Sequence, residues 1–351
     1  MQRVTLIPGD GIGPEVVASA REVVSAAGAA VEFEEVAAGL RAGQELGSAL
    51  PPSVFESIAR TRLALKGPTQ TPFGGDYRIA VQRRDVSGAL IENSHPSVTI
   101  ALRKELGLFV NVRPVRNYPG VASRYENVDL VIFRENSEDL YIGRERMLDE
   151  GTAEAIKIIS AAATERLTRF ALDYMQRTGR RRMTIVHKAN VLKLTDGLFL
   201  RTAENIARGH AEFTVDQRVV DALCMELVVR PEAFDCLLMP NLYGDIVSDL
   251  AAGLVGGLGV APGANIGPEC AVFEAVHGSA PDIAGKDIAN PMAMILSAVM
   301  MLRYSGESTA AERIENALRE VLRERRTVTP DLGGSAGTRA MTRAIVARLG
   351  A

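Results

Sequence analysis

Long hydrophobic runs, an excess of one charge and abundant cysteine are all missing from this sequence of 351 residues. No apolar segment is long enough to span a bilayer. Lysine and arginine number 40 against 43 aspartates and glutamates, so the formal net charge of −3 gives no electrostatic reason to bind nucleic acid or an anionic membrane. These absences favour small-molecule partners, with no nucleic acid and no membrane.

The few cysteines are widely spaced and odd in number, which excludes a disulfide framework and a zinc site built from cysteines. They are Cys224, Cys236 and Cys270. The N-terminal stretch RVTLIP is strand-like from its start and lacks the charged region, apolar region and cleavage site of a secretory signal. We therefore expect a reducing environment and a cytoplasmic location.

The chain is longer than one hydrophobic core usually fills, so we expect two domains or one large α/β unit. Short apolar runs alternate with helical segments, which predicts an α/β fold. The runs lie at 4–7, 63–68, 128–133, 183–187 and 234–240. Apolar spacing predicts helices at 14–27 and 152–177, and the glycine-rich stretch 253–267 is the best candidate for a linker.

Two carboxylates stand in the apolar segment MPNLYGDIVSDLAAGLVGGLG, residues 239–259. Asp245 and Asp249 are four residues apart, so in an α-helix both side chains leave the same face, one turn apart. Like charges at this spacing destabilise a helix slightly. An acidic group in the first turn suits the helix dipole, which accounts for Asp245 but poorly for Asp249. The alternative is a divalent cation such as Mg²⁺ held by both carboxylates.

Three arginines lie beside apolar runs: Arg103 and Arg113 in ALRKELGLFVNVRPV, and Arg134 in IFRENSEDLY. A guanidinium binds a carboxylate with two parallel hydrogen bonds, so three of them suit a substrate with two or three acid groups. The alternative is that they are solvated, or paired with Glu105 and Glu135.

Tyr141 and Lys188 each follow an apolar run, and Lys188 comes directly after MTIVH. A partly buried lysine can titrate low enough to carry a proton, and a tyrosine can donate a proton to a developing enolate. A lone tyrosine or lysine is ordinarily explained by packing or surface exposure.

Two loops are candidate phosphate sites. PGDGIGPEV (8–16) follows a strand and opens a helix, but its glycine spacing is not that of the dinucleotide-binding motif, so a tight turn explains it better. EAVHGSAPDIAGKDIANP (274–291) offers small residues with exposed amides to a phosphate, and Asp282 suits a ribose diol. The small residues are Gly278, Ser279 and Ala280.

Taken together, these motifs resemble the β-decarboxylating dehydrogenases, which include isocitrate, isopropylmalate, homoisocitrate and tartrate dehydrogenases. GDGIGPEV, LRKELGLFVNVRPV, FRENSEDLY, HKANVLKLTDGLF, MPNLYGDIVSDLAAGLVGGLG and HGSAPDIAGKDIANP occur in the family's order over nearly the whole chain. The resemblance implies an α/β fold with a large domain from both chain ends, 1–108 and 257–351, and a small domain, 109–256. It also implies a homodimer whose active site is shared between subunits.

The site residues carry over from the resemblance position by position. Tyr141 and Lys188 match the catalytic pair, Lys188 being contributed across the dimer. Arg103, Arg113 and Arg134 match the arginines that clamp the substrate. Matches to ligands of Mg²⁺ or Mn²⁺ are Asp245, Asp249 and, from the neighbouring subunit, Asp221. Matches to the adenosine-binding loop are His277, Gly278, Ser279, Ala280, Asp282, Ile283 and Asn290. Asp282 followed by Ile283 resembles members that use NAD, and an aspartate also repels a 2′-phosphate.

One departure affects the substrate. Isocitrate enzymes carry a Ser-x-Asn pair soon after the LKGP segment, whereas here the pair reads Ser97-Val98-Thr99 and follows added residues at 79–96. Serine favours isocitrate, and we expect Ser97 and Thr99 to bind substrate. The added stretch carries Arg83, Arg84, Asn93 and His95, and it is either a surface insertion or an element that contacts a larger substituent.

We therefore expect NAD-dependent oxidation of isocitrate to 2-oxoglutarate. The alternatives are the same chemistry on homoisocitrate, isopropylmalate, tartrate or a phosphonate analogue, or a non-catalytic regulatory subunit.

Overall fold

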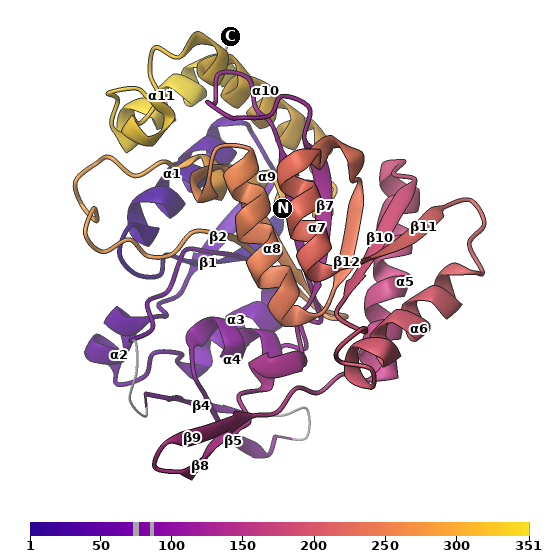
Figure 1. The fold of residues 1–351 in the computed structure, drawn as a ribbon. Helices are drawn as coiled ribbons and strands as arrows, with labels where there is room; N and C mark the ends of the chain where they lie inside the picture. The colour runs from indigo at the N-terminus through magenta and orange to yellow at the C-terminus, as the bar shows by residue number, and fades with distance from the viewer. Residues whose placement is uncertain (73–76, 85–87, 351) are drawn as a thin grey trace.

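The computed structural model describes residues 1–72, 77–84 and 88–350 and is built around one ten-stranded sheet (Figure 1). The strand order is β11-β10-β12-β7-β6-β13-β14-β3-β1-β2. Neighbouring strands are parallel except at β7–β6, β6–β13 and β13–β14. The strands are β1 (Gln2–Ile7), β2 (Val31–Glu35), β3 (Leu63–Lys66), β6 (Val110–Arg116), β7 (Asp129–Glu135), β10 (Arg182–His187), β11 (Thr214–Val219), β12 (Cys236–Met239), β13 (Pro262–Ile266) and β14 (Ala271–Ala275).

Helices cover both faces of the sheet, which confirms the predicted α/β class. The front face carries α3 (Pro52–Thr61), α4 (Val98–Glu105), α7 (Val220–Val229) and α8 (Asn241–Leu254). The rear face carries α5 (Ala161–Thr178), α6 (Thr195–Ala207) and α9 (Met292–Tyr304). Outside α9 pack α1 (Gly13–Ala26), α10 (Ser308–Glu324) and α11 (Thr338–Leu349), and α2 (Leu40–Leu46) lies near the N-terminal strands. Within the described ranges no helix has the length and apolarity needed to cross a membrane.

Two antiparallel hairpins stand apart from the sheet. They are β4 (Ile79–Arg84) with β5 (Leu90–His95), and β8 (Glu145–Asp149) with β9 (Thr152–Ala155). The second hairpin corrects the predicted helix 152–177. The residues Thr152–Ala155 pair with β8, and the helix begins only after Ser160, whose hydroxyl accepts from the Ala163 N–H at 3.2 Å.

The glycine-rich stretch 253–267 is not a linker, so that prediction was wrong. It ends α8, makes a short turn η3 (Leu258–Val260) and enters β13, which pairs with both β6 and β14 in the middle of the sheet. Small side chains allow this strand to be buried on both faces.

The boundary between β6 and β13 divides the sheet into two parts that come from different segments of the chain. Strands on the β11 side all come from 109–256, and those on the β2 side come from the two chain ends. This boundary in the sheet coincides with the predicted domain boundaries, which themselves stay a prediction.

Candidate active site

Three buried arginines converge at the front of the sheet. Arg113 and Arg134 project from the neighbouring strands β6 and β7, and Arg103 comes from the last turn of α4. Their exposures are only 7%, 1% and 7% for Arg113, Arg134 and Arg103. Burial and the positive charge of Arg134 lower the pKa of Arg113 to about 10. Clustered, desolvated guanidinium groups favour anions, so this cluster suits a substrate with several carboxylates.

The carboxylates of α8 face this arginine cluster. Asp245 accepts from the Arg134 guanidinium and from the Tyr141 hydroxyl. Arg113 lies 3.5 Å from an Asp245 oxygen and 3.3 Å from an Asp249 oxygen. Burial raises the pKa of Asp245, but Arg134 and Arg113 outweigh it and hold the pKa low. The prediction that Asp245 lies in the first turn and interacts with the helix dipole was wrong. The helix begins at Asn241, so Asp245 lies beyond the first turn, and its carboxylate accepts from Arg134 and Tyr141.

A glycine lets α8 approach the arginines closely. A Cβ on Gly244 would lie 2.4 Å from Cγ of Arg134, so a side chain here would displace the arginine. In the sequence NLYGD, Asp245 directly follows Gly244. Because Gly244 has no side chain, Arg134 has room to lie beside Asp245.

The two α8 carboxylates suit a divalent cation. Both approach Arg113 from one side of the helix, and burial, with Asp245 nearby, raises the pKa of Asp249, so a cation beside it would be favourable. The part of the chain that the structure describes holds no group of three or more acidic, histidine or cysteine side chains placed to bind a metal ion together. Asp221 instead lies on α7. The residues present therefore fit a metal that takes two ligands from this chain and others from elsewhere.

Lys188 and Asp221 lie together. Lys188 Nζ is 2.5 Å from Asp221 Oδ1, and the Lys188 N–H donates to buried Asp196 at 2.7 Å. Lys157 pairs with Asp196 at 2.7 Å and so holds this turn in place. No hydrogen bond or ion pair among the described residues joins Lys188 or Asp221 to the arginine cluster.

A second charged pair was missed in the sequence. Lys66 ends strand β3 and Glu274 is the last residue but one of β14; they stand opposite each other in register and form a buried ion pair of 2.7 Å. Arg103 Nε donates to Asn265 at 3.1 Å, and Asn265 donates to Glu274 at 2.7 Å. The available signal was a charged residue at or near the end of an otherwise apolar strand, repeated on two strands.

A cavity of about 180 Å³, the front cavity, lies between the arginine cluster and the predicted cofactor loop. It is lined by Lys66, Pro68, Thr69, Thr99, Arg103, Asn111, Arg113, Gly263, Glu274, Ala275, Val276, His277 and Gly278. Thr99 lines this cavity, whereas Ser97 does not. The Ser97 hydroxyl caps α4 by accepting from the Ile100 N–H at 3.2 Å.

The predicted adenosine loop presents polar groups without internal partners. His277 Nε2 is buried and makes no hydrogen bond within the described structure, while Nδ1 lies 3.0 Å from the Gly278 carbonyl. Asp282 is exposed and forms no ion pair with any described residue. These groups are available to a nucleotide. Ser279, Ala280 and Ile283 lie in the same loop, and Asn290 donates to Asp331 at 2.9 Å.

The early glycine loop supports this second loop. The Ile12 N–H donates to the Ser279 carbonyl at 2.8 Å, and a Cβ on Gly11 would lie 1.9 Å from that oxygen. Asp10 accepts three backbone N–H groups, from Leu40, Arg41 and Gln70. The tight-turn interpretation of PGDGIGPEV fits these contacts.

The added stretch 79–96 forms the β4–β5 hairpin, although residues 85–87 and the side chain of Arg84 lie outside the described structure. Its polar side chains converge on Glu105 at the end of α4. Arg83 and Asn93 each donate to it at 2.7 Å, and His95 Nε2 lies at 2.8 Å. Burial raises the pKa of Glu105, but these partners outweigh it and lower the pKa. These contacts anchor the hairpin to α4.

Comparison with known proteins identifies relatives along the whole chain. The sequence model of the family described as isocitrate/isopropylmalate dehydrogenase matches residues 3–346. An isocitrate dehydrogenase [NAD] catalytic subunit of Arabidopsis thaliana is 45% identical over 97% of this chain and 87% of its own. A regulatory subunit of the corresponding Dictyostelium discoideum enzyme is 42% identical over 99% and 92%. The crystal structure of isocitrate dehydrogenase from Methylococcus capsulatus superposes with a TM-score of 0.92, at 46% identity and 99% coverage of both chains.

These relatives contradict the cytoplasmic location expected from the sequence. Both curated relatives are named as mitochondrial proteins. Scarce cysteine indicates only reducing surroundings, which do not distinguish the cytoplasm from another reducing compartment.

Proposed function

The chain belongs to the isocitrate/isopropylmalate dehydrogenase family, and from that membership we propose that it catalyses NAD-dependent oxidative decarboxylation of isocitrate to 2-oxoglutarate. Family membership makes the protein a β-decarboxylating dehydrogenase, and its relatives are NAD-dependent isocitrate dehydrogenases. The observation that carries the proposal is the buried arginine cluster beside the front cavity, with Asp245 and Asp249 on one side and His277 on the other.

The arginines would bind and orient the substrate. Arg103, Arg113 and Arg134 are fixed by burial and by hydrogen bonds, so little side-chain freedom is lost when they engage carboxylates. Asp245 and Asp249, with Asp221 of a second copy, would hold Mg²⁺ or Mn²⁺, which supplies Lewis-acid polarisation when bound.

Proton transfer falls to Lys188 and Tyr141. Lys188 would assist removal of the proton of the substrate hydroxyl as NAD, the hydride acceptor, is reduced. After loss of the β-carboxylate as CO₂, Tyr141 would protonate the carbon from which it left. Burial and the hydrogen bond to Asp245 raise the pKa of Tyr141, which keeps its hydroxyl protonated at neutral pH.

The choice of isocitrate would depend on Thr99, which lines the front cavity, and on the hydroxyl proton of Ser97, whose oxygen already accepts from the Ile100 N–H. A hydroxyl here would hydrogen-bond the distal carboxylate of isocitrate, and an alkyl substituent would leave that hydroxyl unpaired at a cost of about 1–3 kcal/mol. Anchoring of the β4–β5 hairpin to Glu105 supports this choice, because Arg83, Asn93 and His95 are already engaged.

NAD preference would depend on Asp282, and completion of the site on a homodimer. Exposed Asp282 is free to accept from a ribose diol and would repel a 2′-phosphate. Because Lys188 and Asp221 pair with each other and not with the arginine cluster, a second copy would contribute both of them.

The test is a kcat/KM panel of the purified chain alone with NAD and Mn²⁺. The acids are isocitrate, homoisocitrate, isopropylmalate, tartrate and a phosphonomethyl-malate. Isocitrate is expected to be best. A different best acid would refute the serine argument. The relative from Dictyostelium makes a regulatory subunit the second candidate, and it would be favoured if no acid yields NADH.

A further inference from the structure

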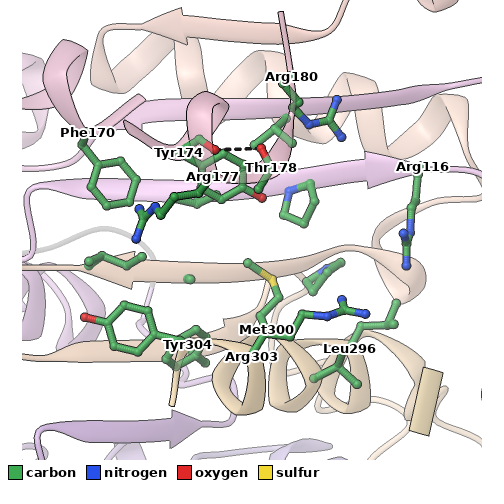
Figure 2. A pocket seen from close by; sticks show the side chains of 18 of the residues that line it. Arg116, Phe170, Tyr174, Arg177, Thr178, Arg180, Leu296, Met300, Arg303 and Tyr304 are labelled. Carbon is green, nitrogen blue, oxygen red and sulfur yellow. Dashed lines mark hydrogen bonds between the residues drawn. The ribbon is translucent and has the colours of Figure 1, made fainter. Parts of the chain in front are cut away.

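A larger cavity, here called the rear cavity, lies on the other face of the sheet and has a volume of about 760 Å³ (Figure 2). Its floor is formed by β6, β7 and β13, and its walls by α5 and α9. In Figure 2, Phe170, Tyr174 and Arg177 face Met300 and Tyr304 across it. The volume falls within the range of about 300–1,000 Å³ typical of small-molecule sites.

The rear cavity is separate from the active site although the two share strands. Alternate residues of a strand point to opposite faces. On β6, Asn111 and Arg113 line the front cavity, whereas Val112 and Pro114 line the rear one. On β13 the residues Pro262, Ala264 and Ile266 line the rear cavity and Gly263 the front. The thickness of one sheet therefore divides them.

The walls of the rear cavity are aromatic and held in place by neighbouring rings. Tyr174 packs edge-on against Phe133 at 5.1 Å between centroids, and Tyr304 against Phe273 at 5.7 Å. Tyr304 lines the cavity and remains 50% exposed. Rigid aromatic walls of this kind favour an apolar ligand body with low loss of side-chain entropy.

The charges around the rear cavity are unbalanced towards positive. Its lining contains five arginines against two carboxylates, Asp129 and Glu315. Glu315 is bound by both Arg116 and Arg303. Asp129 is bound by Arg180. Both carboxylates of the lining are thus already paired with arginines.

Two arginines of the rear-cavity lining, both on α5, have no carboxylate partner among the described residues. Among residues 1–72, 77–84 and 88–350, neither Arg166 nor Arg177 forms an ion pair with a carboxylate. Arg166 lies over the Phe109 ring at 4.7 Å and donates to the Ser137 hydroxyl at 3.3 Å, and Arg177 donates only to the Asp173 carbonyl at 3.3 Å. Each guanidinium therefore keeps free N–H groups at the edge of an apolar cavity.

We propose that the rear cavity binds an amphipathic organic carboxylate, with its apolar body between α5 and α9 and its carboxylate on Arg166 or Arg177. The aromatic walls match the body, and the uncompensated guanidinium groups match the charge. Alcohols or cations of the same length lack the group that the arginines recognise.

Decanoate is the probe. Binding to the purified full-length chain is measured by isothermal calorimetry. In a second assay, decanoate and its uncharged analogue decanol are each used to displace a bound fluorescent naphthalenesulfonate. Arg177→Ala is expected to weaken decanoate binding about tenfold, as loss of one charged hydrogen bond predicts. Met300→Trp narrows the space between α5 and α9 and is expected to weaken decanoate binding by at least about tenfold.

The matched control is Arg169→Ala, on the same helix. Arg169 is exposed, pairs with Glu165 at 2.8 Å and is absent from the cavity lining. Its removal should leave decanoate affinity unchanged. Equal affinity in wild type, Arg177→Ala and Met300→Trp would place decanoate elsewhere and overturn the proposal. Displacement by decanol as strong as by decanoate would also overturn it, since the cavity would then be merely apolar.

Discussion

Lys66 and Glu274 stand opposite each other near the ends of the parallel strands β3 and β14, 2.7 Å apart from Nζ to Oε2. Both are buried, and Arg103 approaches the same carboxylate at 3.5 Å. Burial raises the pKa of Glu274, but Lys66 and Arg103 outweigh it and lower the pKa to about 2. The pair thus connects the floor of the front cavity with the arginine cluster.

Lys66→Met should destabilise the fold by roughly 3–5 kcal/mol, because removing one partner leaves a buried charge uncompensated. Urea denaturation followed by circular dichroism measures this. The double variant with Glu274→Gln should recover part of the loss. A single variant as stable as the wild type would show that the pair is not tightly coupled.

The same pair predicts a dependence of stability on pH. The folded pKa of Glu274 lies below its ordinary value of 4.5, so its contribution is complete above that pH and is lost as the pH falls towards about 2. The stability advantage of wild type over Glu274→Gln, about 3 kcal/mol at neutral pH, should shrink over that window. Melting temperatures at stepped pH test it. The exposed variant Glu269→Gln should show no such trend.

Tyr141→Phe should lower kcat by about 10²–10⁴-fold with little change in KM, since it removes a proton donor and leaves the arginines in place. Initial rates with isocitrate and NAD measure both parameters. Tyr125→Phe, whose hydroxyl bonds the Val228 carbonyl, serves as control. A kcat near wild type would remove Tyr141 from the proposed chemistry.

Asp282→Lys should shift the NAD to NADP ratio of kcat/KM towards NADP by at least about tenfold, or ~1.4 kcal/mol, because it replaces repulsion of the 2′-phosphate by attraction. Wild type is expected to prefer NAD strongly. Glu56→Lys, the same charge change at an exposed position of α3, should leave the ratio unchanged. Similar ratios in both variants would contradict the role of Asp282.

Mixing inactive variants tests the shared site. If Lys188 acts in the neighbouring subunit, hybrids of Lys188→Ala with Asp245→Asn contain one intact site, and a random equal mixture should recover about a quarter of wild-type activity. Lys188→Ala mixed with Asp221→Asn should recover none, because paired Lys188 and Asp221 enter the same site. Activity after exchange is measured alongside native mass spectrometry. No recovery in the first mixture, with heterodimers present, would refute sharing.

Features that depend on local spacing were predictable from the sequence. The four-residue step from Asp245 to Asp249 predicted that both carboxylates lie on one face of a helix. In the structure both residues belong to the helix α8. Local periodicity misled at Thr152, because apolar spacing continued through a hairpin that only pairing with β8 defines.

Features that depend on strand order were not predictable. Lys66 and Glu274 are 208 residues apart in sequence, and only the β3–β14 register brings them together. Likewise, Arg83, Asn93 and His95 all hydrogen-bond Glu105. The register of the β4–β5 hairpin brings them together, and the sequence does not reveal that register. The glycines around β13 resemble a linker until the neighbouring strands are known.

The alternation along β6 limits how this chain can change in length. Inserting or deleting one residue of β6 between Val110 and Arg113 would turn every following side chain of the strand to the opposite face. Arg113 would then enter the apolar rear cavity and Pro114 the front one. Point substitutions affect one cavity at a time, whereas a single-codon insertion here would disable both together, even in a sheet that still formed.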